Sequence, residues 1–219
     1  GKVHSGRKAE DFMAQVPGYG EAVCAWKDVP AEAGADERHG TSRRRKPEAK
    51  QIACEVQRLL AVLPSDMSIG VITFYAAQRD CIFEELAGPG FTEKGEGSWR
   101  VRPEHAGNGQ CPERLRIGTV DAFQGKEFDV VLLSVVRSNK LAMGLPDEAD
   151  SEEVYETSAS RKYGHLRTSN RLNVAMSRQR RLLVAVGDRA MFMGQAASQA
   201  VPEMSAFVEL CQEEARHVD

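Results

Sequence analysis

Three apolar runs stand out along the chain. They cover Ile69–Thr73, Val130–Val136 and Leu182–Val186. Runs whose two alternating faces are both apolar are typical of parallel strands that helices cover on both sides. Ser134 is the one polar residue inside the second run. Two weaker strand candidates of the same kind lie at Ala22–Trp26 and Leu115–Thr119.

Helical periodicity fills the segments between these runs. A first helix is predicted to begin near Pro47, because proline is favoured at the first helical position and Glu48 suits the first turn. Further helices are predicted after Ala76, after a cap at Ser169 or Asn170, and from Pro202 onward. Strands that alternate with helices predict an α/β fold, a three-layer sandwich with a mostly parallel central sheet.

Three stretches lack a clear period and are rich in glycine or charge. They span residues 30–46, 88–111 and 141–166. Loops of this length are uncommon inside a compact domain, so we expect them to be surface insertions. With 219 residues, a single domain over residues 1–219 is the expected organisation.

Composition excludes several classes of function. The net charge of −3 gives no global signal for nucleic acid, so any such surface must be local. The five cysteines have no C-x-x-C spacing, which predicts reduced thiols and no metal site. No apolar run approaches the ~20 residues of a membrane span, and the first residues lack a secretory core. We therefore expect no membrane partner and a cytoplasmic location. The missing initiator methionine suggests a fragment of a longer protein.

Two polar segments carry the candidate chemistry. They are Gly118–Asn139, GTVDAFQGKEFDVVLLSVVRSN, and Arg171–Asp188, RLNVAMSRQRRLLVAVGD. The first joins two strands through a turn, and in open α/β sheets ligands collect at the carboxyl ends of strands. Gly125 allows a close backbone approach, and the Glu127 carboxylate suits the acceptance of hydrogen bonds from hydroxyl groups. A polar connection between two strands is the ordinary alternative for this segment.

Arginines dominate the second segment. Placed on a helix, Arg171, Asn173 and Arg178 fall away from the apolar side, and a guanidinium offers forked donors to phosphate oxygens. Residues 161–181 contain Lys and Arg but no Asp or Glu, which predicts a locally positive surface. A solvated basic face is the ordinary alternative. No G-x-x-x-x-G-K-[ST] phosphate loop occurs in these 219 residues.

Taken as strings, the two segments resemble motifs V and VI of superfamily 1 nucleic-acid helicases of the up-frameshift type. The strings are Thr119–Glu127 followed by an apolar strand, and Arg-Leu-Asn-Val-Ala-Met-Ser-Arg from Arg171. A weaker third block, Ile69–Gln78, has Phe74 where the family usually has proline. The resemblance covers about 40–187 and implies the second of two RecA-like motor domains, related to the P-loop NTPases.

The resemblance also implies roles for individual residues. Arg178 would be catalytic, as the arginine that contacts the γ-phosphate. Nucleotide-side residues would be Glu127, Gly125 and Gln124. Nucleic-acid contacts would be Thr73, Thr119, Asn173 and Arg137, although a surface salt bridge is an equal alternative for Arg137.

ATP and Mg²⁺ are the implied cofactors, held mainly by a first motor domain whose phosphate loop this chain lacks. The implied partners are single-stranded DNA or RNA and the first RecA-like domain of the same full-length chain. The function predicted is therefore that of an ATP-dependent helicase domain that is inactive by itself. The alternative is a non-catalytic nucleic-acid or partner-binding module derived from a helicase. The residues do not distinguish DNA from RNA.

Overall fold

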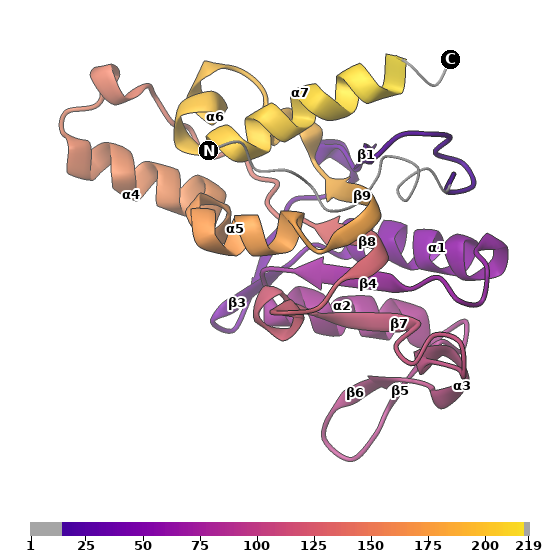
Figure 1. Cartoon of the computed structure of the whole chain (residues 1–219). Coiled ribbons are helices and arrows are strands. Elements are labelled where there is room, and N and C mark those ends of the chain that lie inside the picture. The colour runs from indigo at the N-terminus through magenta and orange to yellow at the C-terminus, as the bar shows by residue number, and fades with distance from the viewer. Residues whose placement is uncertain (1–14, 217–219) are drawn as a thin grey trace.

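A computed structural model describes residues 15–216, and a five-stranded parallel sheet forms its centre (Figure 1). The strand order is β1-β9-β8-β4-β7, and every neighbouring pair in it is parallel. The strands are β1 (Cys24–Asp28), β4 (Ile69–Thr73), β7 (Leu115–Thr119), β8 (Phe128–Ser134) and β9 (Gln179–Gly187). The predicted α/β class with a parallel central sheet is confirmed.

The central strands are those with the strongest apolar signal. Every residue of β4 and β8 is buried, since both faces of these strands are covered. The edge strands β1 and β7 keep partly exposed residues, which explains their weaker pattern in the sequence. Gly70 permits unusually close packing, because a Cβ there would lie 2.9 Å from Cε1 of Phe123.

Helices cover the sheet on both faces (Figure 1). On one face, α1 (Lys46–Val62) and α2 (Ala76–Ala87) bury their apolar residues with Ile69, Val71 and Leu132. The elements that pack on the other face and share a second core cluster include four helices and a 3₁₀ turn. These elements are η3 (Val120–Phe123), α4 (Glu152–Tyr163), α5 (Ser169–Met176), α6 (Gln195–Ala200) and α7 (Pro202–Arg216).

Two of the three predicted loops carry short elements. Residues 30–46 contain the 3₁₀ turn η2 (Ala31–Ala33) and the hairpin β2 (Glu37–His39) and β3 (Ser42–Arg44). Residues 88–111 contain the hairpin β5 (Thr92–Lys94) and β6 (Trp99–Val101), followed by α3 (Pro103–Ala106). Further 3₁₀ turns are η4 (Pro146–Glu148), η5 (Gly164–Arg167) and η6 (Arg189–Phe192).

The third predicted loop, 141–166, is wrong, because α4 lies inside it. Only Tyr155, Ala159 and Tyr163 of this helix are buried, so its apolar stripe is too thin to stand out in the sequence. Its end signals were nevertheless present. The Ser151 side chain accepts a hydrogen bond from the Val154 amide, the first turn is acidic and the last turn is basic.

The end of β8 also differs from the prediction, by two residues. Val135 and Val136 are apolar and buried, but they follow the strand instead of extending it. Val136 has a φ of 68°, a conformation that is strained for a β-branched residue. Its amide donates to Glu48 Oε1 at 2.8 Å, and this buried contact ends the strand. Among residues 15–216, no helix has both the length and the apolar character to cross a membrane.

Candidate nucleotide and nucleic-acid site

The two signature segments lie side by side. The Phe128 amide, at the start of β8, donates to the Arg178 carbonyl at 2.8 Å. Three arginines of the second segment form ion pairs with carboxylates of the first. The pairs are Arg171–Asp121 at 3.3 Å, Arg180–Glu127 at 3.4 Å and Arg181–Asp129 at 3.2 Å. The fold therefore joins the segments into one surface.

Arg178 differs from its neighbours in what its side chain contacts. Its Nε donates to the Val174 carbonyl at 3.1 Å, Nη2 to Ser177 Oγ at 2.8 Å, and Nη1 to the Lys126 carbonyl at 3.4 Å. All three acceptors are neutral oxygens. Of the four arginines in the second segment, only Arg178 has no carboxylate partner within residues 15–216. Its half-buried guanidinium thus keeps an uncompensated charge.

The predicted position of Arg178 on a helix is wrong. The helix α5 ends at Met176, Ser177 is its C-terminal cap, and Arg178 lies in the connection to β9. The change of direction has a cause in the contacts. The Arg178 carbonyl accepts a hydrogen bond from the Phe128 amide, and its side chain donates to the Val174 carbonyl in the last turn of α5. Arg178 therefore connects the end of the helix to the start of β8.

The segment from Gln124 to Glu127 lies next to Arg178. Gln124, Gly125 and Glu127 are exposed, and Gly125 has a φ of 74°, in the region that favours glycine. The Lys126 carbonyl accepts the hydrogen bond from Arg178. This segment precedes β8, so it lies at the amino end of that strand. The expectation of a site at the carboxyl ends is wrong for these residues.

Thr73 and Thr119 do lie at carboxyl ends. They end β4 and β7 and face each other in the register of the two strands. Thr119 is partly exposed, whereas Thr73 is 1% exposed and its Oγ1 has no hydrogen-bond partner among the described residues. Only Thr119 is therefore open to a ligand as the chain is folded here. Asn173 is exposed on α5.

Arg137 does not lie where the sequence placed it. Both readings, a nucleic-acid contact and a surface salt bridge, require an exposed guanidinium, but Arg137 is 2% exposed. It forms an ion pair with Asp36 at 3.2 Å and donates to the Lys162 carbonyl at 2.8 Å. A second donation reaches the Arg161 carbonyl. Arg137 therefore ties the C-terminal carbonyls of α4 to the exit of β8.

A buried polar cluster under β8 was missed by the sequence reasoning. Glu48 is fully buried and accepts hydrogen bonds from Ser134 Oγ at 2.5 Å and from the Val136 amide. Arg45 Nη1 lies 3.5 Å from its other oxygen, and Gln78 donates to Ser134 Oγ at 3.0 Å. Burial raises the pKa of Glu48 to about 7, against the opposing effect of these contacts. The single polar residue in an apolar run, Ser134, was the signal for this cluster.

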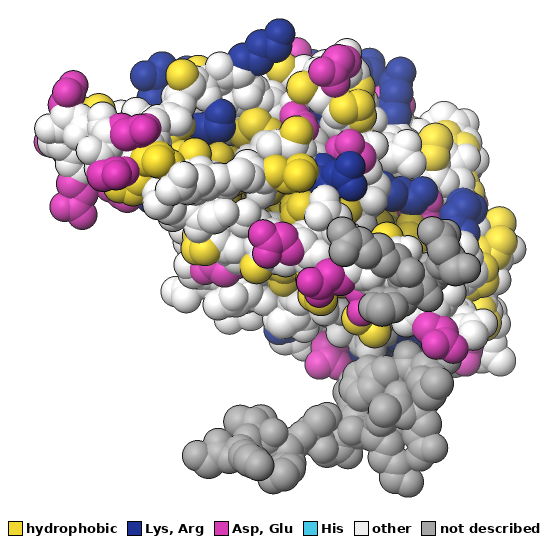
Figure 2. Space-filling model, turned by 90° about the horizontal axis from the view of Figure 1, so that it is seen from above, with side chains coloured by type: hydrophobic (Ala, Val, Ile, Leu, Met, Phe, Trp, Pro, Cys, Tyr) yellow, Lys and Arg dark blue, Asp and Glu magenta, His cyan; other side chains and the backbone are white. Residues whose placement is uncertain are grey.

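The predicted positive surface over residues 161–181 is largely neutralised. Arg167 pairs with Glu156 at 2.8 Å, and the three ion pairs between the signature segments compensate further arginines. The acids come from other parts of the chain, which composition within one window does not reveal. Blue and magenta side chains both occur on the face of the molecule seen in Figure 2.

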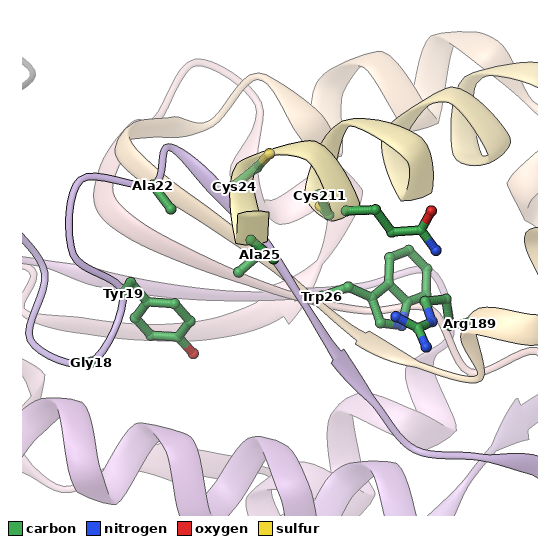
Figure 3. A pocket seen from close by; sticks show the side chains of 10 residues that line it. Gly18, Tyr19, Ala22, Cys24, Ala25, Trp26, Arg189 and Cys211 are labelled. Carbon is green, nitrogen blue, oxygen red and sulfur yellow. The ribbon is translucent and has the colours of Figure 1, made fainter. Parts of the chain in front are cut away.

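Two pockets differ in their relation to these residues. One of about 560 Å³ lies between β1 and α7, with Trp26, Arg189, Cys24 and Cys211 among its lining (Figure 3). None of the predicted site residues lines it. The other, of about 410 Å³, is lined by Thr119. Within residues 15–216, no group of three or more His, Cys, Asp or Glu side chains could hold a metal ion.

Comparison with known proteins identifies the family. The model of the AAA domain family matches residues 3–190. A DNA polymerase alpha-associated DNA helicase A of Saccharomyces cerevisiae is 45% identical over 74 residues, 34% of this chain and 8% of that protein. Regulator of nonsense transcripts 1 of Caenorhabditis elegans is 30% identical over 149 residues, 68% of this chain and 11% of that protein.

Longer alignments reach the same kind of protein. The putative helicase MOV-10 of Gallus gallus is 27% identical over 209 residues, 87% of this chain and 18% of that protein. The chain thus spans less than a fifth of each of these relatives. Since the family model matches most of the chain, the resemblance to superfamily 1 helicases of the up-frameshift type is confirmed, and the chain belongs to the AAA domain family.

Proposed function

We propose that this chain is the second motor domain of an ATP-dependent nucleic-acid helicase or translocase. In this role it supplies the arginine finger and part of the nucleic-acid track. The observation that carries the proposal is the state of Arg178. Its guanidinium is partly exposed, keeps its charge and is held in place by three neutral oxygens.

These contacts suit an arginine finger. An arginine finger must be oriented before the reaction and must not be paired with a protein carboxylate, because its charge stabilises the transferring phosphoryl group. Val174, Ser177 and Lys126 orient Arg178 from both signature segments. The neighbouring Glu127 carboxylate is exposed and suits the ribose hydroxyls better than a phosphate.

ATP and Mg²⁺ fit this chain only in part. The residues present offer one cation and one carboxylate on the nucleotide side, but no phosphate loop occurs in the sequence. The first RecA-like domain would therefore hold the triphosphate and the metal. Mg²⁺ would neutralise charge on the phosphates, while Arg178 would reach the γ-phosphate from this chain.

The separation of the two groups supports a motor. Thr119 lies at the carboxyl end of β7, whereas Gln124, Glu127 and Arg178 lie at the amino ends of β8 and β9. The turn η3 and the loop after it connect these two edges directly. A shift of Glu127 on nucleotide binding would thus be transmitted to Thr119 through a short, well-packed connection that contains the buried Phe123.

Substitution of Arg178 in the full-length protein tests the proposal. We expect Arg178→Ala to lower ATP hydrolysis by roughly 10³-fold or more and to leave the binding of single-stranded nucleic acid largely intact. Arg180→Ala is the matched control, because Arg180 is paired with Glu127. Loss of binding with hydrolysis preserved would instead make Arg178 a residue of the nucleic-acid track.

The isolated 219-residue chain offers a second test. We expect no ATP hydrolysis from it, with or without single-stranded DNA or RNA, because it contains half of the composite site. Sustained turnover by the purified chain, abolished by Arg178→Ala, would show a complete site and contradict this division of labour.

A further inference from the structure

We propose that the β5–β6 hairpin and the end of β7 form a binding pocket for one nucleotide of a single strand. Trp99 would stack on the base and Lys94 would lie beside the phosphate. The inference rests on the proposed function, because it extends the nucleic-acid track beyond Thr119. It concerns an element outside the signature segments, the insertion at residues 88–111.

The pocket is built from three elements. Arg79 and Phe83 come from α2, Lys94 and Trp99 from the hairpin, and Thr119 from the end of β7. Its volume of about 410 Å³ lies within the range of ~300–1,000 Å³ that is usual for ligand pockets. Because the side chain of Thr119 lines the same space, a strand that contacts this hydroxyl would pass the pocket directly.

Trp99 is a preformed stacking surface. Its ring lies parallel to that of Phe83, with an interplanar angle of 8° and centroids 6.3 Å apart. Phe83 is 6% exposed and belongs to α2, so the core of the domain fixes the plane of the indole. Trp99 itself stays partly exposed and lines the pocket. An aromatic ring that the core holds in one plane and that stays partly exposed is the kind of platform on which unpaired bases stack.

The hairpin also places a cation next to this ring. Lys94 and Trp99 are register partners and form the last pair before the turn. The Lys94 ammonium lies 5.8 Å from the centre of the indole and has no carboxylate partner within residues 15–216. By contrast, Arg79 and Asp80 pair at 2.7 Å and cancel each other's charge. The pocket therefore has one net positive charge, which suits a single phosphate.

Single-stranded nucleic acid is the occupant that these features favour. Stacking on Trp99 and attraction of a phosphate to Lys94 do not depend on the identity of the base, so the pocket would accept every base. In a duplex the base faces are stacked and closed, so stacking on Trp99 requires an unpaired strand. Gly118 and Thr119, at the end of β7, also line the pocket.

The tryptophan count makes the test direct, since the chain contains only Trp26 and Trp99. In Trp26→Phe, fluorescence reports on Trp99 alone. We expect (dT) and (rU) oligonucleotides of about 16 nucleotides to quench it in a saturable manner. In Trp99→Phe, fluorescence reports on Trp26, which belongs to the opposite edge strand and contacts Phe192. We expect no quenching in that variant.

Affinity measurements complete the experiment. Trp99→Ala should weaken binding of both oligonucleotides by roughly 5- to 100-fold, and Trp99→Phe by less, because a smaller ring remains. Lys94→Gln should lower the dependence of log affinity on log salt by about 0.7, the value for one phosphate of a single strand. Lys50→Gln, an exposed change on α1 outside the pocket, should leave that slope unchanged.

The outcomes separate this inference from the proposed function. If Thr119→Ala weakens oligonucleotide binding, but Trp99 fluorescence is not quenched and Trp99→Ala binds normally, the pocket is overturned. The proposed nucleic-acid track at Thr119 would then remain supported. Nucleoside monophosphates that quench Trp99 as strongly as the oligonucleotides would also overturn it, in favour of a free-nucleotide site. Absence of any oligonucleotide binding to the unchanged chain would contradict both.

Discussion

Two arginines from the signature segments, Arg137 and Arg178, end in opposite environments. Arg137 is buried at the exit of β8, with Asp36 as ion-pair partner and helix carbonyls as further acceptors. Arg178 is partly exposed just before β9, and within residues 15–216 its side chain donates to neutral oxygens. In sequence both are arginines that flank an apolar strand. The comparison shows that a charge with a complete set of partners supports the fold, whereas an oriented charge without a counter-ion remains available to a ligand.

The difference extends to the regions around them. The region at the exit of β8 contains buried Asp36, Ser138 and Asp188, which are linked through hydrogen bonds of 2.6–2.8 Å. The region around Arg178 contains ion pairs whose members are largely exposed, such as Arg171–Asp121. Exposed pairs contribute about 0–1 kcal/mol, whereas removal of one member of a buried pair costs about 3–5 kcal/mol.

The largest expected effect is therefore that of Arg137→Ala on stability. The change removes one of the two arginines that pair with buried Asp36, leaves Arg43 as its counter-ion, and frees the last carbonyls of α4. We expect a loss of about 3–5 kcal/mol in the free energy of unfolding, measured by urea denaturation. Arg178→Ala is the control and should cost less than about 1 kcal/mol. A stable Arg137→Ala variant with weakened nucleic-acid binding would support a direct contact of Arg137 with nucleic acid instead.

The second prediction concerns the pH dependence that Glu48 creates. Burial raises its pKa from 4.5 to about 7 in the folded chain, so between these values the folded state binds more protons than the unfolded state. Stability due to Glu48 is therefore complete below about pH 4.5 and falls as pH rises toward 7, by roughly 3 kcal/mol in total. Glu48→Gln should abolish this component.

The measurement is the free energy of unfolding at several pH values for both chains. The difference between them isolates Glu48, because other groups titrate in both. Burial lowers the pKa of His165, for example, which makes stability rise with pH and opposes the effect of Glu48. A difference that is constant from pH 4.5 to 8 would show that Arg45 keeps Glu48 ionised throughout.

The sequence predicted best those features that depend on local pattern. The strands Ile69–Thr73 and Leu115–Thr119 have the predicted bounds, and the last helix begins at Pro202 as predicted. The helix α4 was not predicted, because few of its residues are buried in the core. The end of β8 was predicted two residues too late, because Val135 and Val136 are still buried after the strand's hydrogen bonds end.

The environments of the site residues were harder to predict, because their partners are distant in the sequence. Arg137 lies 101 positions from Asp36, and Ser134 lies 86 positions from Glu48, so no local pattern predicts their burial. The resemblance assigned Glu127 and Arg178 to the same nucleotide, and the two segments do lie side by side. The motif strings did not show that the residues proposed for the nucleotide side and Thr119 lie at opposite ends of the strands, because that follows from the course of η3 across the sheet.

A smaller effect is expected from the serines of the two regions. Ser134→Ala removes the hydroxyl that donates to Glu48 and accepts from Gln78, so both lose a buried partner. We expect a loss of about 1–3 kcal/mol in the free energy of unfolding. Ser177→Ala should cost less than about 0.5 kcal/mol, because Ser177 is exposed. Equal effects of the two substitutions would remove the distinction between the regions.

The smallest effect is expected for the pair of Glu127 and Arg180. Their side chains are 45% and 46% exposed and approach to 3.4 Å, so a double-mutant cycle with Glu127→Gln and Arg180→Ala should give a coupling below about 0.5 kcal/mol. A weak pair is what the proposed role requires, because Glu127 can leave Arg180 for ribose hydroxyls at little cost. A coupling above about 1 kcal/mol would instead make Glu127 a structural partner of Arg180, as Asp36 is of Arg137. Arg178 would then be the one residue of this pair of segments proposed to contact the nucleotide.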